Sequence, residues 1–210
     1  IHREIDAIWR IESAKVIATL ARFVRDVGLA EDLAQDALVA ALEQWPVSGV
    51  PRKPGAWLTT AGKRRAIDQF RRNRRFRERI EAIGYELALA GEGELVDFDE
   101  AFGEDRIPDD LLRLIFTACH PSLSKEARVA LTLRLLGGLT TEEIARAYLV
   151  PEPTVAQRIV RAKRTLGQSA VAFEPPDTTE RSERLPAVLE VIYLIFNEGY
   201  SATSGAEWIR

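Results

Sequence analysis

The sequence contains one cysteine, Cys119, two histidines and no methionine. A single cysteine excludes an internal disulfide and fits a reducing cytoplasm, where we expect this protein to act. Cys119 and His120 are adjacent and His2 is the only other histidine, so the sequence offers no three-ligand zinc set. No Gly-rich phosphate loop and no serine-histidine-aspartate spacing indicates catalysis. We therefore expect neither a cofactor, nor a metal, nor an enzyme.

Long apolar runs are also absent: no run reaches the length that crosses a bilayer, and no signal peptide is visible, so no membrane contact is expected. The composition, 46% hydrophobic and 29% charged, is ordinary for one or two globular domains. Because the chain starts at Ile1 without a methionine and stops inside an unfinished apolar segment, we interpret it as a fragment of a longer protein.

Charge of neither sign dominates, since the net charge is only −3, yet the sign alternates along the chain. Residues 1–80 carry a net +6, 81–107 carry −8, 108–170 carry +3 and 171–210 carry −4. Nucleic acid responds to the local field within a Debye length of about 8 Å, not to the net charge. Two basic modules that alternate with two acidic segments are therefore compatible with DNA binding.

The segment 140–166 predicts two helices around a short turn, a helix-turn-helix. Thr140 and Glu143 have the spacing of a capping box at the start of the first helix. Pro151 and Pro153 are tolerated only in the first turn of the second helix, where their missing N–H groups have no partner to lose.

The second helix of this motif has two distinct faces. Its apolar stripe consists of Val155, Ile159, Ala162 and Leu166, and its opposite side of Thr154, Gln157, Arg158, Arg161 and Arg164. The alternative is a solvated surface helix. Against it, the helix carries four cations, including Lys163, and no acidic residue between Thr154 and Leu166, whereas a merely soluble face usually mixes signs. The pattern favours DNA binding.

The first 80 residues predict three helices. The first is ended by Gly28, the second spans 30–45, and the third starts near Gly55 after a Pro/Gly-rich loop at 46–54 and continues into a basic run at 63–79. The side chains expected inside include Ile5, Ile8, Trp9, Ile11, Val16, Ile17, Leu20, Phe23, Ala34, Leu38, Ala41, Leu42, Trp45, Trp57, Leu58, Ile67 and Phe70. The basic run by itself is also compatible with a solvated helix end.

Three motifs in register resemble one family, the extracytoplasmic-function sigma factors that direct bacterial RNA polymerase to promoters. AEDLAQDAL at 30–38 is similar to its polymerase-binding helix in region 2, WLTTAGKRRAID at 57–68 to its promoter-melting helix, and 124–166 to its region 4. WP at 45–46, ACHP at 118–121, AQRIVRAK at 156–163 and LIFNEGY at 194–200 resemble the subgroup with a C-terminal helical-repeat extension.

The resemblance implies a docking surface for core RNA polymerase. Its expected residues on the second helix are Asp32, Gln35, Asp36 and Val39, which would contact the beta-prime clamp helices, while region 4 would meet the beta flap. An exposed acidic and amide strip suits a basic partner surface. The alternative is a solvated helix face.

The resemblance also implies two DNA contacts. The loop at 46–54 would capture a flipped base of the downstream promoter element, and the cations expected near it are Arg52, Lys53, Lys63, Arg64, Arg65, Arg71 and Arg72. That loop has no aromatic residue, and Trp57 is expected in the core. Thr154, Gln157, Arg158 and Arg161 would read the upstream element in the major groove. Lys163 and Arg164 would hold phosphates.

The acidic segment 81–107 has the composition of a linker. The resemblance implies that its five carboxylates at 92, 94, 97, 99 and 100 lie in the polymerase cleft. The alternative is a solubilising tether. The tail, 171–210, begins the C-terminal extension, and its apolar run 185–196 is expected to pack on region 4, on region 2 or on the rest of the extension. If it covers Arg158 and Arg161, the chain is autoinhibited. The expected further partners of the chain are its own extension or an anti-sigma factor.

These observations predict an all-α protein with region 2 at 1–80, the linker at 81–107, region 4 at 108–170 and the tail from 171. Two other functions stay open. A stand-alone helix-turn-helix repressor, with an N-terminal effector or dimerisation module, would bind a palindrome by itself. A nuclease-like metal enzyme would use the carboxylates at 97–105 and need a divalent ion.

Overall fold

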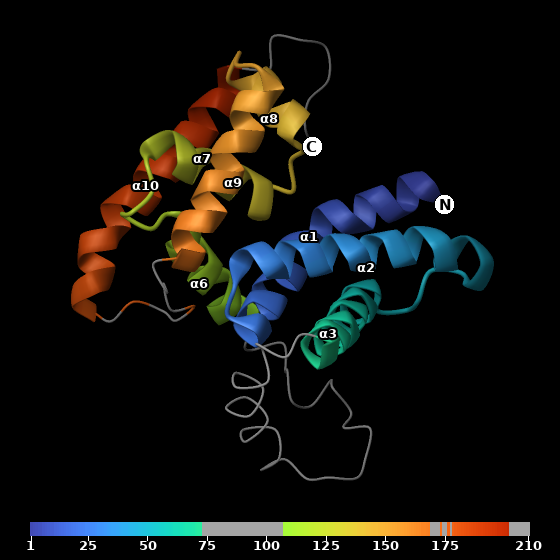
Figure 1. The fold of residues 1–210 in the computed structure, drawn as a ribbon. Coiled ribbons are helices and arrows are strands. Elements are labelled where there is room, and N and C mark those ends of the chain that lie inside the picture. The colour runs from blue at the N-terminus through green and yellow to red at the C-terminus, as the bar shows by residue number, and fades with distance from the viewer. Residues whose placement is uncertain (73–106, 169–172, 174–175, 177, 202–210) are drawn as a thin grey trace.

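The computed structural model describes residues 1–72, 107–168, 173, 176 and 178–201, and these residues form helices and no strand (Figure 1). The elements are α1 (His2–Val24), α2 (Val27–Ser48), α3 (Pro54–Arg72), α6 (Ile107–Ala118), α7 (Lys125–Leu135), α8 (Thr141–Ala147), α9 (Glu152–Gln168) and α10 (Thr178–Ser201). The prediction of an all-α fold is confirmed. The acidic linker predicted at 81–107 lies, except for Ile107, outside the described residues.

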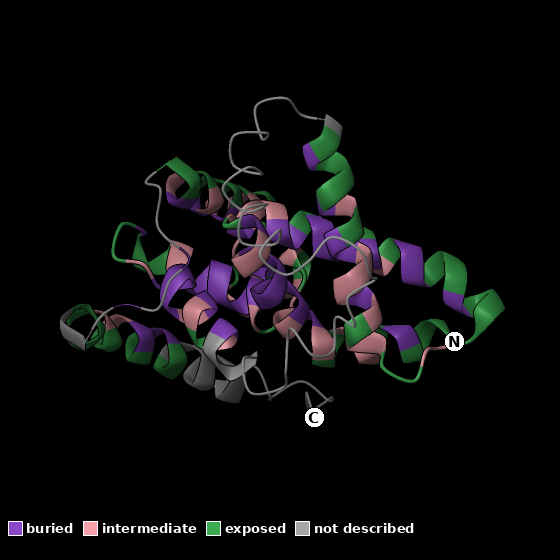
Figure 2. Cartoon of the chain, turned by 90° about the horizontal axis from the view of Figure 1, so that it is seen from below, coloured by how far each residue is buried: buried purple, intermediate pink, exposed green. Residues whose placement is uncertain are grey.

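Two groups of helices pack against one another. Helices α1, α2 and α3 form a bundle, and α6 to α10 form a second group that contacts it mainly through α6 on α1 and α9 on α2 (Figure 1). The hydrophobic core is continuous through both groups, and the buried residues run along the middle of the molecule in Figure 2. The two modules that the sequence predicts are therefore held together in this structure.

The junction between α1 and α2 differs from the prediction, because α1 ends at Val24 and Gly28 lies in the first turn of α2. Arg25 adopts a left-handed conformation with φ 55°, and its N–H bonds the carbonyl of Ala21. Asp26 then caps α2 by accepting a hydrogen bond from the Leu29 N–H at 2.9 Å. An arginine thus takes the left-handed position that the prediction assigned to a glycine.

The end of α2 was also predicted too early, since the helix continues through Pro46 to Ser48. Pro46 removes one hydrogen bond, the one that would reach the carbonyl of Leu42 four residues back. Because Pro46 stands only two residues from the helix end, the local cost does not stop the helix.

Three large apolar side chains expected inside are exposed: Ile11 at 67%, Leu42 at 37% and Ile67 at 38%. The buried faces of these helices combine other large apolar side chains with alanines. A Cβ placed on Gly62 of α3 would lie only 2.7 Å from Cδ1 of Leu20, so glycine allows α3 to approach α1 closely. At this contact a glycine, and not a large apolar side chain, determines how closely α3 and α1 approach each other.

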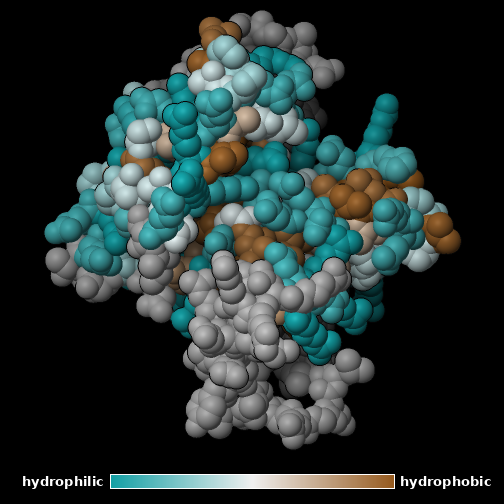
Figure 3. Space-filling model, viewed as in Figure 1, coloured by the Kyte–Doolittle hydropathy of each residue, from teal (hydrophilic) through white to brown (hydrophobic). Residues whose placement is uncertain are grey.

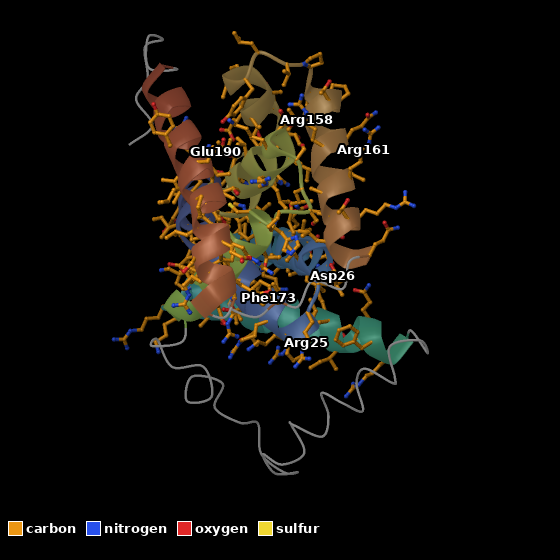
Figure 4. The ribbon with its side chains drawn as sticks, turned by 90° about the vertical axis from the view of Figure 1, so that its left-hand side faces the viewer. Arg25, Asp26, Arg158, Arg161, Phe173 and Glu190 are labelled. Atoms are coloured by element: carbon orange, nitrogen blue, oxygen red, sulfur yellow. The ribbon has the colours of Figure 1, made fainter. Side chains whose placement is uncertain are left out.

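The tail helix α10 packs on α7 and α6. Val188 and Val191 are buried there, and Glu190 forms an ion pair with Lys125 of α7 at 2.8 Å. Figure 4 places α10 and α9 on opposite sides of α7, and Arg161 is exposed. The tail packs on region 4, which is one of the predicted options, and Arg161 is exposed among the described residues, while autoinhibition by the tail stays a prediction.

The face of the molecule seen in Figure 3 is mostly hydrophilic, with an apolar patch over α1 and α2 near the N-terminus. None of the helices in the described ranges has both the length and the apolar character that a membrane-spanning segment needs. Within the same ranges, no group of three histidine, cysteine, aspartate or glutamate side chains has the arrangement of a metal site.

Candidate nucleic-acid and partner interfaces

The helix-turn-helix consists of α8 and α9, and local interactions define where α8 begins. The Thr140 side chain accepts a hydrogen bond from the Glu143 N–H at 3.1 Å, and the Thr140 N–H donates one to the Glu143 carboxylate at 2.8 Å. These bonds form the predicted capping box, and the one from the Thr140 backbone is the largest cause of the lowered pKa of Glu143. Leu149 in the turn has φ 51° and is 92% exposed.

The predicted division of α9 into two faces is confirmed. The apolar stripe is buried and consists of Val155, Ile159, Ala162 and Leu166. On the other side, Gln157, Arg161 and Arg164 are exposed, whereas Thr154 and Arg158 are half-buried. In Figure 4, Arg158 and Arg161 are labelled along the upper part of α9, which leaves the exposed basic face available to a partner.

Arg158 also contributes to a small apolar cavity of about 160 Å³ among α7, α8 and α9. The other lining residues are Lys125, Glu126, Val129, Ala130, Ile144, Tyr148 and Val155. The stem of Arg158 therefore packs against the helix-turn-helix itself, which limits the freedom of its guanidinium group.

Lys163 does not face solvent with the other cations of α9. Its Nζ lies 2.6 Å from Oε2 of Glu31 and 3.8 Å from Oδ1 of Asp32, both on α2. The prediction that Lys163 holds a DNA phosphate is therefore not met in this conformation. The reason is tertiary: the C-terminal half of α9 lies against the start of α2, where two carboxylates compete for the ammonium group.

The strip predicted to bind polymerase is displayed on α2, with Asp32, Asp36 and Val39 exposed. Gln35 is half-buried and donates a hydrogen bond from Nε2 to Oε1 of Glu31 at 2.7 Å. Burial raises the pKa of the Asp32 carboxyl, Lys163 opposes that rise, and Glu31 adds to it. Asp36 lies 3.4 Å from Nη1 of Arg65 on α3, so these two predicted site residues form an ion pair.

Lys63, predicted to hold a phosphate, is 6% exposed and lies among α1, α3 and α6. Burial lowers its pKa to about 8, the nearby Arg22 adds to that effect, and Asp110 opposes it. Asp110 is bound by Arg22 at 3.2 Å and by Arg113 at 3.8 Å. The phosphate prediction for Lys63 is wrong because α6 covers it, and α6 is 44 residues away along the chain.

The other cations of the first module are more accessible. Arg52, Lys53, Arg64 and Arg71 are exposed, Arg65 is half-buried, and the side chain of Arg72 lies outside the described residues. Arg64 and Arg65 border a cavity of about 480 Å³ between α2 and α3, with Ala40, Gln44, Trp57, Thr60 and Ala61. Two guanidinium groups beside an aromatic ring and an amide can bind a planar, anionic or polar ligand.

Trp57 has a place that the sequence did not predict, since it is half-buried and lines this cavity as well as packing on the core. Its ring stands edge-on to the buried Trp45, with centroids 5.3 Å apart and an interplanar angle of 67°. Such an edge-to-face contact fixes the ring of Trp57 while its other surface borders the cavity.

Glu31 is the residue that sequence reasoning missed. It is 3% exposed, and its carboxylate accepts a hydrogen bond from Nε of Arg134 at 2.7 Å in addition to its contacts with Lys163 and Gln35. The sequence contained one signal, the paired acids Glu31 and Asp32 at the start of the helix. Their different burial could not be predicted, because Arg134 and Lys163 are more than 100 residues away.

Comparison with family models assigns both modules. The model described as Sigma-70 region 2 matches residues 10–76, and the one described as Sigma-70, region 4 matches residues 113–166. Residues 184–210 match a family of unknown function, DUF6596. The first two matches contain α2, α3 and the helix-turn-helix up to Leu166.

Several curated proteins are similar to this chain. An uncharacterized protein of Rhizobium meliloti is 42% identical over 93% of this chain and 45% of its own length. The probable ECF RNA polymerase sigma factor SigI of Mycobacterium tuberculosis is 29% identical over 81% of this chain and 57% of its own length. The ECF RNA polymerase sigma factor SigL of that organism is 30% identical over 69% and 76%, respectively. The chain thus spans about half the length of the first two relatives, and no solved structure matches it.

Proposed function

This chain belongs to the ECF RNA polymerase sigma factors of the sigma-70 family, and we propose that it binds core RNA polymerase and directs it to promoter DNA. The observation that carries the proposal is the combination, on one chain, of an exposed acidic strip on α2 with an exposed basic face on α9. The protein acts through binding and not through catalysis. Its polymerase partner places that action in the bacterial cytoplasm.

The docking face for polymerase is the strip of Asp32, Gln35, Asp36 and Val39 on α2. Three of these side chains are exposed on a rigid helix whose opposite face is buried. An acidic strip of this kind complements a basic surface such as the beta-prime clamp helices, and it sets the rate and register of docking more than the affinity. The helix-turn-helix module meets the beta flap.

Upstream promoter DNA is read by α9. Gln157 and Arg161 reach bases in the major groove, with Thr154 and Arg158 beside them, and each bidentate contact discriminates by about 1–3 kcal/mol. Arg164 holds a phosphate and thereby sets the position of the helix without reading sequence. Polymerase holds both modules on the promoter at once, which raises the effective concentration of each at its element.

Downstream DNA is opened by α3 and the preceding loop, and the cavity beside Trp57 receives an unstacked base. Stacking on an aromatic side chain contributes about 1–3 kcal/mol per base, which offsets the cost of unstacking. Arg64, Arg71 and the loop residues Arg52 and Lys53 are exposed around this region and suit phosphates. Sequence reasoning gave the loop no aromatic partner for the base, and Trp57 supplies one.

A stand-alone repressor is not favoured. Its N-terminal half would have to be an effector or dimerisation module, whereas residues 10–76 match Sigma-70 region 2.

The tail helix α10 packs against the rest of the C-terminal extension or binds an anti-sigma factor. Either role is compatible with its exposed apolar side chains, Leu185, Leu189, Ile192 and Tyr193.

Gel filtration with bacterial core RNA polymerase tests this function. The chain should co-elute with core polymerase, and the triple variant with alanine at Asp32, Gln35 and Asp36 should not. A matched control replaces two other exposed acids, Glu4 and Asp6 of α1, with alanine and should still co-elute. Equal retention of the triple variant would reject the docking face, and a complete absence of co-elution would reject the sigma function of this chain.

A further inference from the structure

The outward side of α9 carries one large apolar side chain, Val160. The other large apolar residues of this helix, Val155, Ile159 and Leu166, are buried in the stripe that packs on α7 and α8. Val160 lies on the opposite side of the helix and is 64% exposed. The division of α9 into an apolar and a polar face is therefore broken at this position, within the face proposed to read DNA.

The helix period places Val160 among the residues proposed to contact DNA. Gln157 precedes it by three positions and Arg164 follows it by four. Side chains at these spacings are neighbours on one face, with Cβ atoms about 5–6 Å apart. Arg161 directly follows Val160, is exposed as well, and extends from α9 away from α7 in Figure 4. Val160 therefore stands as an apolar group between an amide and two guanidinium groups.

Local stability does not explain a valine at this position. Valine is a poorer helix former than alanine, because its branched Cβ restricts χ1. Since Val160 is largely exposed, it also adds little to the hydrophobic core. Single exposed apolar side chains are common on protein surfaces. Val160 differs from these in its setting, because its neighbours on the same face are proposed to contact the promoter.

The major groove offers one group that matches an apolar side chain, the C5-methyl group of thymine. All four bases present hydrogen-bond donors or acceptors there, which glutamine and arginine can bind, and thymine alone adds a methyl group. A valine in a helix is held mainly in one rotamer, so it loses little conformational freedom when it packs against this methyl group. Valine thus suits thymine and offers no hydrogen bond to any other base.

We propose that Val160 reads a thymine of the upstream promoter element through the C5-methyl group of that base. The inference rests on the proposed function and extends it, because the polar residues of α9 discriminate by hydrogen bonds and Val160 by apolar contact. Base pairs are stacked about 3.4 Å apart, so side chains about 5–6 Å apart on α9 face base pairs that are one or two steps apart. The thymine lies within about two base pairs of the one that Gln157 reads.

Deoxyuridine tests this contact, since it differs from thymidine only by the missing C5-methyl group. Core RNA polymerase assembled with this chain first selects its upstream element from a pool of randomised duplexes. The thymines of the selected element are then replaced by deoxyuridine one at a time, and binding is measured by fluorescence anisotropy at one salt concentration. With the parent chain, replacement of one thymine should weaken binding by about fourfold, which corresponds to the burial of one methyl group.

Val160→Ala should abolish this difference. The variant keeps the helix, because alanine is the better helix former and position 160 is exposed. It should bind the thymine and deoxyuridine duplexes equally well at that one position. The matched control, Ile11→Ala, removes an apolar side chain of similar exposure, 67%, from α1 and should keep the difference of about fourfold. The two affinities are compared within each variant, so a general change in polymerase binding cancels.

Three results would overturn the thymine contact while the proposed function stands. They are an upstream element without thymine, an element in which no deoxyuridine weakens binding, and a loss that persists in Val160→Ala. If instead the chain does not bind core polymerase, or the complex enriches no upstream element, the proposed function fails and the thymine contact fails with it.

Discussion

Replacing Lys63 with methionine should stabilise the fold at pH 7. Lys63 is 6% exposed, and burial lowers its pKa to about 8 from an ordinary value of 10.5. At pH 7 the amine is charged in both the folded and the unfolded chain, and its charge is less favourable in the folded one. The difference between the two pKa values corresponds to about 3 kcal/mol of folding free energy.

Methionine keeps an unbranched apolar stem of similar length and removes this charge. The carboxylate that faces Lys63, Asp110, keeps Arg22 at 3.2 Å and Arg113 at 3.8 Å, so it is not left without a cation. The loss of the attraction between Lys63 and Asp110 reduces the gain. We therefore expect Lys63→Met to raise the free energy of unfolding by about 1–3 kcal/mol.

The pH dependence follows from the direction of the shift. Between pH 8 and 10.5 the unfolded chain binds more protons at Lys63 than the folded chain, so this residue makes stability rise with pH across that window. The advantage of the methionine variant should therefore be largest near pH 7 and shrink as the pH approaches 10. Groups that titrate in both proteins, such as the Cys119 thiol, cancel in the difference.

Urea unfolding followed by circular dichroism at several pH values from 7 to 10 measures this difference. The exposed neighbour Arg64, replaced by methionine, is the control and should change stability by no more than about 0.5 kcal/mol. A Lys63→Met protein that is less stable than the parent at pH 7, or a difference that does not depend on pH, would refute the reasoning.

The remaining predictions concern a turn and the DNA-reading helix. Gly138→Ala should destabilise the fold by about 1–2 kcal/mol in urea unfolding, because φ is +64° and the added Cβ lies 3.3 Å from the Ser13 hydroxyl. Gly167→Ala, inside α9 with its added Cβ 3.8 Å from Asp26, should instead stabilise by about 0.5–1 kcal/mol, and a loss of stability there would contradict the helix geometry. Arg164→Gln should weaken promoter binding by the polymerase complex for all sequences and reduce the slope of log K against log salt by about one, whereas Gln157→Ala should relax specificity at one base pair. Equal effects of the two on specificity would contradict the assigned roles.

Local interactions explain what the sequence predicted well. The Thr140–Glu143 capping box and the apolar stripe of α9 depend on residues within a few positions of one another, so their spacing is sufficient to predict them. The same holds for the exposure of Asp32 and Asp36, which follows from the helix period of α2. The three motifs in register were enough to indicate the family that the comparisons then confirmed.

The site predictions that this structure does not bear out share a different cause. Lys63 and Lys163 have the sequence context of DNA-binding cations, yet one is covered by α6 and the other faces Glu31 of α2. Each outcome depends on a contact between the two modules, and no helical period carries information about such a contact. The start of α2 was misplaced for a related reason, since Asp26 and not a glycine marks the boundary.

By itself, the sequence determined the class of fold, the helix-turn-helix and the identity of the two modules, because these depend on short-range periodicity, capping and motif order. Only the tertiary structure decided which charged residues remain available to partners. Burial sets the cost of a charge and the presence of an opposite charge offsets it, and both are settled when helices distant in sequence pack together. For Glu31, Lys63 and Lys163, that packing decides between a surface contact and an internal one.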